Sequence, residues 1–454
     1  MDAIKFPPRP SAATPTISAL QAKLVNQIDQ GDTYIELYAT VVEMGEELES
    51  QDVVNAHDMI TALREDKGRQ MTVLLHTIPR PVLRSIVMRM VAYDFWERDS
   101  DNRTLLYDKE GPGAYIVTLS IVDRRGHTWS VNENKELINL VETYARAIET
   151  YEKHCDTYGH SQLCVDELAA MQVAANIDKQ YEKLDFSSPP DSPTSSVEYR
   201  SNSDVSGIPD WWSMPRFVSS SETNKSWSVR HLVSMLRKRN IAGVDQNEPS
   251  KQSVCMVGSA DDFEKHIQKY RLISALRNTT HCWGLLVSCL KYANLEPQET
   301  IIPVCKAWKI EHINMAEILV TVLAGSLISV GGLDIKQPGT KSEKNPPSDR
   351  VFESCRRHVC GAKPWFEENM AHSNPPMKRL IDAERELESM DHNALQESVA
   401  EVKRLDQELT EKLAKLEAIE KHQEEDQKVL GEAEEIVRFC TDNPDVIDAL
   451  SFFS

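Results

Sequence analysis

The chain has 454 residues, with 51 Lys and Arg against 71 Asp and Glu, so its formal net charge is -20. Hydrophobic residues make up 41% of it and charged residues 27%, which excludes a collagen, a fully disordered chain and a polytopic membrane protein. The length allows two or three domains, and the acidic total excludes a chain that is basic throughout while permitting a local basic surface.

The cysteines and the first residues indicate a cytoplasmic protein. Nine cysteines are an odd number for a disulfide framework, and the N-terminal sequence MDAIKFPPRPSAATPT lacks the apolar core of a secretory signal. The most apolar run, residues 315–330, is shorter than the roughly 20 residues of a membrane-spanning helix and contains Glu317. We therefore expect this run to be a buried core helix and expect no membrane partner.

Apolar periodicity predicts a mainly α fold of two helical lobes joined by a disordered linker, with a C-terminal coiled-coil helix. Ile17, Leu20, Leu24 and Ile28 show the helical spacing at the start of the first lobe. The predicted segments are a flexible arm (1–15), an N-terminal helical lobe (16–184), a disordered Ser- and Pro-rich linker (185–225), a second helical lobe (226–332), a linker with a short helical segment (333–376), a coiled coil (377–440) and an acidic and apolar tail (441–454).

One segment of the first lobe has a β pattern. GAYIVTLSIV, residues 113–122, is rich in β-branched and aromatic residues, and the turn sequence DRRG and then HTWSV follow it. This order predicts a β-hairpin over 113–131, with the helical pattern returning at Asn132. Because a two-stranded hairpin is marginal by itself, it must lie against helices or pair with a strand elsewhere.

Exposed aromatic residues inside the predicted linker have two interpretations. Trp211 and Trp212, with Met214 and Phe217, could form a docking peptide for a partner protein, or they could pack back on the folded lobes. The C-terminal tail is a second segment that could dock on a partner protein.

The last part of the chain has the clearest pattern, a heptad seam with Glu and Lys at most other positions. The seam could pair with another copy or fold back on its own chain, and its narrow apolar stripe favours pairing between molecules. The predicted oligomerisation residues are Leu395, Val399, Val402, Leu405, Leu409, Leu413, Leu416 and Ile419.

Motifs of catalysis and cofactor binding are missing from the sequence, so we expect neither an enzyme nor a cofactor. It contains no phosphate-binding glycine loop, no dinucleotide fingerprint, no nucleophile elbow and no H-E-x-x-H. Three Cys/His clusters lack the paired ligand units of structural zinc, so we expect no metal site there. They are His154, Cys155, His160 and Cys164; His281, Cys282 and Cys289; and Cys355, His358, Cys360 and His372.

Basic residues cluster in the second lobe against the acidic background. If they converge, they would form a cationic groove that holds phosphate backbones, and neighbouring aromatic residues could stack on unpaired bases. They could equally be solvated faces of ordinary amphipathic helices. The candidate nucleic-acid contacts are Lys225, Arg230, Arg237, Lys238, Arg239, Lys265, Lys269 and Arg271.

These patterns favour a non-enzymatic, self-associating structural or scaffold protein that forms homo-oligomers through its C-terminal helix. The alternative is a protein that coats single-stranded RNA. Two helical lobes with a basic seam and terminal extensions resemble, in outline, the layout of viral nucleocapsid proteins, and this resemblance implies lobes that clamp the RNA backbone. The long linker between the lobes departs from a rigid clamp.

Overall fold

The structure is a computed structural model, and it forms two compact units, Met1–Ser373 and Asn374–Ser454. The predicted arm and tail, and residues 185–208 of the predicted linker, lie outside the described residues. The structure describes residues 16–50, 57–66, 69–97, 101–155, 162–181, 209, 211–218, 224–240, 245–272, 280–335, 338–339, 346–376, 379, 401–416, 430–435 and 438.

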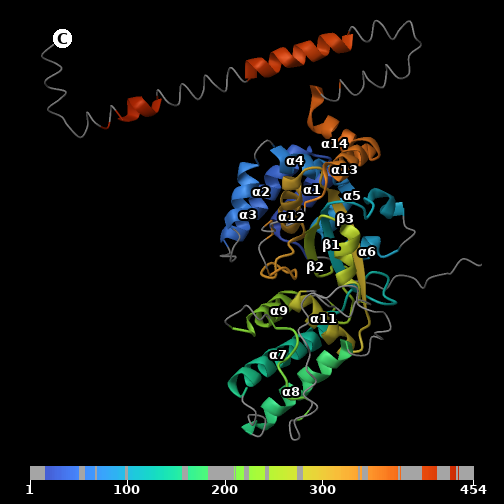
Figure 1. Ribbon diagram of the computed structural model, residues 1–454, viewed down its shortest axis with the longest axis vertical. Coiled ribbons are helices and arrows are strands. Elements are labelled where there is room, and N and C mark those ends of the chain that lie inside the picture. Colours follow the sequence, from blue (N-terminus) through green and yellow to red (C-terminus); the bar gives the residue numbers. More distant parts are fainter. Residues whose placement is uncertain are drawn as a thin grey trace, which may run out of the picture. The chain divides into compact units, whose positions relative to one another are not determined.

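The first unit is mostly helical, which confirms the predicted mainly α fold (Figure 1). Its strands are β1 (Gly113–Ile121), β2 (Cys255–Ala260) and β3 (Pro297–Lys306). Its helices are α1 (Ala19–Gln30), α2 (Tyr34–Ser50), α3 (His57–Glu65), α4 (Gln70–His76), α5 (Arg80–Val87), α6 (Val91–Phe95), α7 (Val131–Lys153), α8 (Val165–Asp178), α9 (Trp227–Lys238), α10 (Phe263–Ile267), α11 (His281–Tyr292), α12 (Ile310–Ala324), α13 (Asp349–Gly361) and α14 (Pro364–Ser373).

Local sequence sets the starts of the long helices. Ser130 caps α7 in a capping box, because its hydroxyl accepts the backbone N–H of Glu133 while the Glu133 carboxylate accepts the N–H of Ser130. Ser18 and Gln21 make the same arrangement at α1. At the other end of α1, Gly31 adopts the left-handed conformation (φ 82°) that glycine accepts without strain, and this ends the helix.

The predicted β-hairpin is wrong in its second arm. β1 is a strand, but residues 127–130 are not, and the backbone N–H of Thr128 donates to the Ser250 carbonyl at 2.8 Å. Within the described residues the sheet has the order β2-β1-β3, with β1 antiparallel to both neighbours. Both edges of β1 are therefore occupied by strands from the segment predicted as the second lobe, so β1 does pair with strands elsewhere.

Two hydrophobic cores lie against the two faces of β1. Its alternate side chains point to opposite faces: Ala114 and Ile116 join the core made by α1–α6 and α12, whereas Tyr115, Val117 and Leu119 join the core made with α7, α8, α9 and α11. Figure 1 shows these two groups of helices at the two ends of the first unit. Each predicted lobe therefore contributes helices to both cores.

A short part of the predicted linker belongs to the second of these cores. Trp212 is 8% exposed and Phe217 is 4% exposed, and both pack in the core with α7 and α11. The hydroxyl of Tyr144 accepts the backbone N–H of Phe217 at 2.9 Å. Of the two interpretations of this aromatic group, these contacts support packing against the folded part of the chain.

The apolar run at 315–330 forms most of α12, and its side chains are buried from Ala316 to Ala324. This confirms the prediction of a buried core helix. Among the described residues, no helix combines the length and the apolar character needed to cross a membrane.

Candidate functional site

The C-terminal helical segment carries the predicted seam. Residues 401–416 form a helix in which Leu409, Leu413 and Leu416 are 42%, 53% and 56% exposed. Val402 and Leu405 lie on the same stripe and are partly exposed. The structure thus contains five of the predicted oligomerisation residues on one described helix, while Leu395, Val399 and Ile419 lie outside the described residues.

The faces of this helix away from the seam are charged and solvated. Arg404 pairs with Glu401 at 2.6 Å, and Lys412 pairs with Glu408 at 3.1 Å, one turn apart in each case. Hydrogen bonds from these cations hold the pKa of Glu401 and of Glu408 below the ordinary value. Exposed pairs of this kind support helix formation by a few tenths of a kcal/mol and do not cover the leucines.

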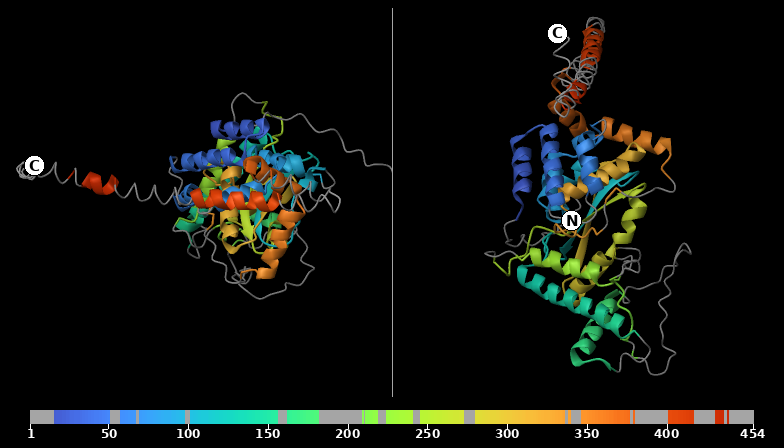
Figure 2. Two further views of the ribbon diagram at one scale, coloured as in Figure 1. Left: turned by 90° about the horizontal axis from the view of Figure 1, so that it is seen from above. Right: turned by 90° about the vertical axis from the view of Figure 1, so that its left-hand side faces the viewer.

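Three cations of the α9 region pair with carboxylates of α7. Helix α9 packs along α7, and Figure 2 shows the two helices side by side. The pairs across this contact are Arg230 with Glu149 (2.8 Å), Arg237 with Glu142, and Lys225 with Glu152 (4.0 Å). Three of the candidate nucleic-acid contacts therefore have their charge balanced by α7.

The remaining candidates fall into two groups. Lys238 donates to the Ser329 carbonyl at 2.6 Å, and Arg239 donates to the Gln252 carbonyl at 2.6 Å. Elsewhere, Lys265 pairs with Asp262 at 3.2 Å within the α10 region. Arg271 is partly buried, and the side chain of Lys269 lies outside the described part of the chain.

Arg89 is a cation that the sequence patterns did not single out as a contact. It follows α5 in a left-handed conformation (φ 57°), and its guanidinium reaches the C-terminal end of α12. A Cβ atom at Gly325 or at Gly331 would overlap a terminal nitrogen of Arg89, and both glycines have positive φ. Two glycines therefore leave the space that the guanidinium occupies.

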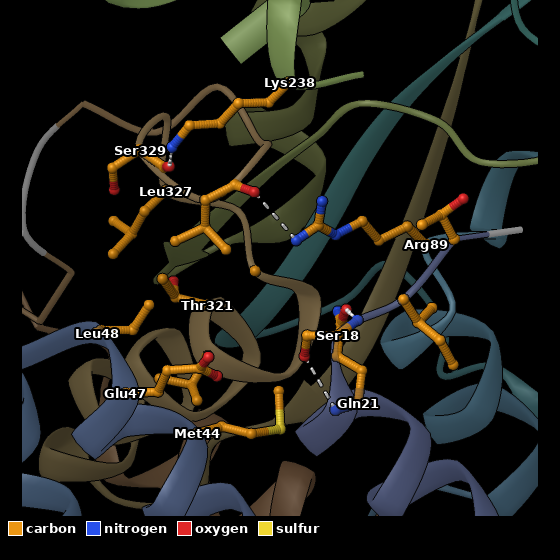
Figure 3. Close-up of a pocket in the computed structure, with 15 residues that line it drawn as sticks. Ser18, Gln21, Met44, Glu47, Leu48, Arg89, Lys238, Thr321, Leu327 and Ser329 are labelled. Carbon is orange, nitrogen blue, oxygen red and sulfur yellow. Dashed lines mark hydrogen bonds between the residues drawn. The ribbon is translucent and has the colours of Figure 1, made fainter. Parts of the chain in front are cut away.

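A pocket of about 380 Å³ lies where Arg89 meets the loop after α12 (Figure 3). Lys238 and Arg89 reach it from different elements, and Ser329 and Leu327 of the loop form one wall. The other lining residues come from α1 and the residues just before it, from α2, and from α12 and the loop after it: Thr16, Ile17, Ser18, Gln21, Met44, Glu47, Leu48, Thr321, Val322, Gly325 and Val330.

Positively charged side chains lie close enough together in this region to affect one another's pKa. Burial, together with the nearby charge of Arg89, lowers the pKa of Arg239 to about 10. Burial also lowers the pKa of Arg89, with the nearby Cys255 acting in the opposite direction. Arg239 additionally lies over the ring of Trp129, with 5.9 Å from its central carbon to the ring centroid.

One histidine of the third Cys/His cluster has a charged partner within the fold. His358 of α13 lies 3.4 Å from Asp108, and Asp108 also pairs with Lys306 at the end of β3. Burial opposes ionisation of Asp108, but the hydrogen bond from Lys306 holds its pKa below the ordinary value. Among the described residues, no group of three or more His, Cys, Asp or Glu side chains is placed to hold a metal ion.

Comparison with known proteins gives no relative for this chain: no family model, no curated protein and no solved structure matches it.

Proposed function

We propose that this protein is a non-enzymatic structural or scaffold protein that self-assembles through its C-terminal helix. The observation that carries the proposal is the stripe of exposed leucines on the helix at 401–416. Burying one such side chain stabilises an assembly by about 1.5–3 kcal/mol, so a stripe of several supplies a strong drive to associate.

The spacing of the apolar residues on this helix supports the same proposal. The stability of a helix in water comes mainly from packing of its apolar face. The seam positions 402, 405, 409, 413 and 416 are three or four residues apart, which is the spacing of a coiled-coil stripe. A second copy of the chain presents the same stripe and is therefore a matching partner.

Replacing Leu409, Leu413 and Leu416 together with glutamate in the full-length chain is expected to abolish self-association. Glutamate keeps a high helix propensity, so the change removes the apolar stripe without breaking the helix. Size-exclusion chromatography with light scattering should give the monomer mass of 51.4 kDa for this variant and a multiple of it for the original chain.

A matched control places three negative charges on another face of the same helix: Gln407→Glu, Thr410→Glu and Ala414→Glu. This control is expected to keep the mass of the original assembly, because these positions lie away from the seam. If the leucine variant keeps the assembled mass, or if the control dissociates equally, the proposed seam is wrong.

RNA coating stays a second proposal, supported by Lys238 and Arg239, which bond to backbone carbonyls rather than to carboxylates. Recording the absorbance ratio at 260 and 280 nm in the same experiment tests it. An RNA-coating protein purifies with nucleic acid and loses it steeply as salt is raised.

A further inference from the structure

Three cations near the C-terminal end of α12 have no carboxylate partner among the described residues. Among the residues that the structure describes, no carboxylate pairs with Arg89, Lys238 or Arg239; their hydrogen-bond partners are backbone carbonyls. The other cations of the α9 region differ, because α7 supplies each with a carboxylate. The region thus has local positive charge within an acidic chain.

Arg89 has unused hydrogen-bonding capacity. A guanidinium carries five N–H donors, but the one acceptor given by the described residues is the Val330 carbonyl at 3.5 Å, a long distance for a hydrogen bond. The Nε atom of Arg89 is buried, with no hydrogen-bond partner among the described atoms. Leaving such a group unsatisfied costs free energy that a bound oxyanion would recover.

The pocket beside these cations has the size and lining of a small-ligand site. Its volume of about 380 Å³ is within the range of small-molecule pockets, which are mostly apolar with a few converging polar groups. Met44, Leu48 and Leu327 supply apolar walls, and Glu47 adds a negative charge from α2. An anion at the Arg89 and Lys238 end would face two positive side chains against this one carboxylate.

We propose that this pocket binds a phosphate group, with Arg89 donating two parallel hydrogen bonds and Lys238 contributing a second positive charge. Guanidinium geometry matches two phosphate oxygens, and a lysine ammonium binds phosphate as a point charge. A small phosphate ester and the backbone of single-stranded RNA share this chemistry. The proposal is independent of self-assembly, because every pocket residue belongs to the first unit.

The test is isothermal titration calorimetry of the full-length protein with three probes: uridine, uridine monophosphate and a twelve-nucleotide oligouridylate. We expect saturable binding of the monophosphate and no binding of uridine, because uridine lacks the phosphate. Oligouridylate bound about a hundredfold more tightly than the monophosphate identifies RNA as the source, and equal affinities identify a small phosphate ester.

Two variants test the site itself. Lys238→Glu changes an exposed side chain, and Arg89→Gln removes the guanidinium; each is expected to weaken binding of the monophosphate about tenfold or more. Because Arg89→Gln could disturb folding, its thermal unfolding is measured as well, and Lys238→Glu keeps the test valid if Arg89→Gln unfolds.

The matched controls are Arg84→Gln on α5 and Lys153→Glu on α7, which change exposed cations that pair with Asp29 and Glu167. Both controls are expected to keep the affinity of the original chain. The proposal is overturned if the original chain binds neither phosphate probe at about 10 mM, if uridine binds as well as its monophosphate, or if the controls weaken binding as much as Lys238→Glu.

Discussion

Replacing Gly113 with alanine is expected to destabilise the first unit by about 3 kcal/mol or more. Gly113 begins β1 with φ 156°, a conformation that residues with a side chain rarely adopt. A Cβ atom there would overlap the carbonyl oxygen of Cys305 and lie 2.9 Å from the Cα atom of Lys306. The neighbouring strand cannot yield easily, because its backbone is held by the hydrogen bonds of the sheet.

Urea unfolding followed by circular dichroism measures this loss of stability. The control is Gly361→Ala, at the end of α13, where a Cβ atom meets nothing within 4 Å. There the free energy of unfolding should stay unchanged or rise by up to about 1 kcal/mol, since alanine is the better helix former. Equal effects of the two substitutions would contradict the placement of β1 between β2 and β3.

The position of β1 also shows what the sequence could not predict. The β-branched run at 113–122 correctly indicated a strand, because residue type and alternation are local properties. Its partners were not predictable, because β2 begins at Cys255 and pairing over such a separation depends on the packing of both faces. The turn sequence after the strand made a hairpin the simplest prediction. Thr128, which follows that turn, instead donates hydrogen bonds to the backbone carbonyls of Ser250 and Gln252.

The helices were more predictable than their contacts. The helix at 401–416 and the buried run of α12 follow from 3.6-residue periodicity, which needs no knowledge of distant residues. The charge of Arg237 could be read from the sequence, but its partner Glu142 depends on α9 packing along α7. Arg89 was inconspicuous because it and Arg84 are scattered cations within an apolar segment, and its relation to Lys238 exists only in the folded chain.

Acidification from pH 6.5 to pH 5 is expected to cost the first unit about 2 kcal/mol of stability through His312. This side chain of α12 is 2% exposed, and its ring meets that of Trp308 edge-on, with 4.5 Å between centroids. The Nδ1 atom is buried with no hydrogen-bond partner among the described atoms. Burial, aided by the charge of Lys309, lowers the pKa of His312 from 6.5 to about 4.

The sign follows from proton uptake. Between pH 6.5 and pH 4 the unfolded chain protonates this imidazole while the folded chain keeps it neutral, so the unfolded state binds more protons and stability falls as pH falls. The contribution is fully present above pH 6.5 and is lost towards pH 4. Burial lowers the pKa of His76 as well, so this residue acts in the same direction.

A phenylalanine at position 312 has no such proton to bind. Urea unfolding of His312→Phe at pH 7 and at pH 5 should therefore show a difference about 2 kcal/mol smaller than that of the original chain. The other titrating groups are the same in both chains, so they cancel when the two pH dependences are compared. An unaltered pH dependence in His312→Phe would mean that the buried imidazole is not the group that makes the fold sensitive to acid.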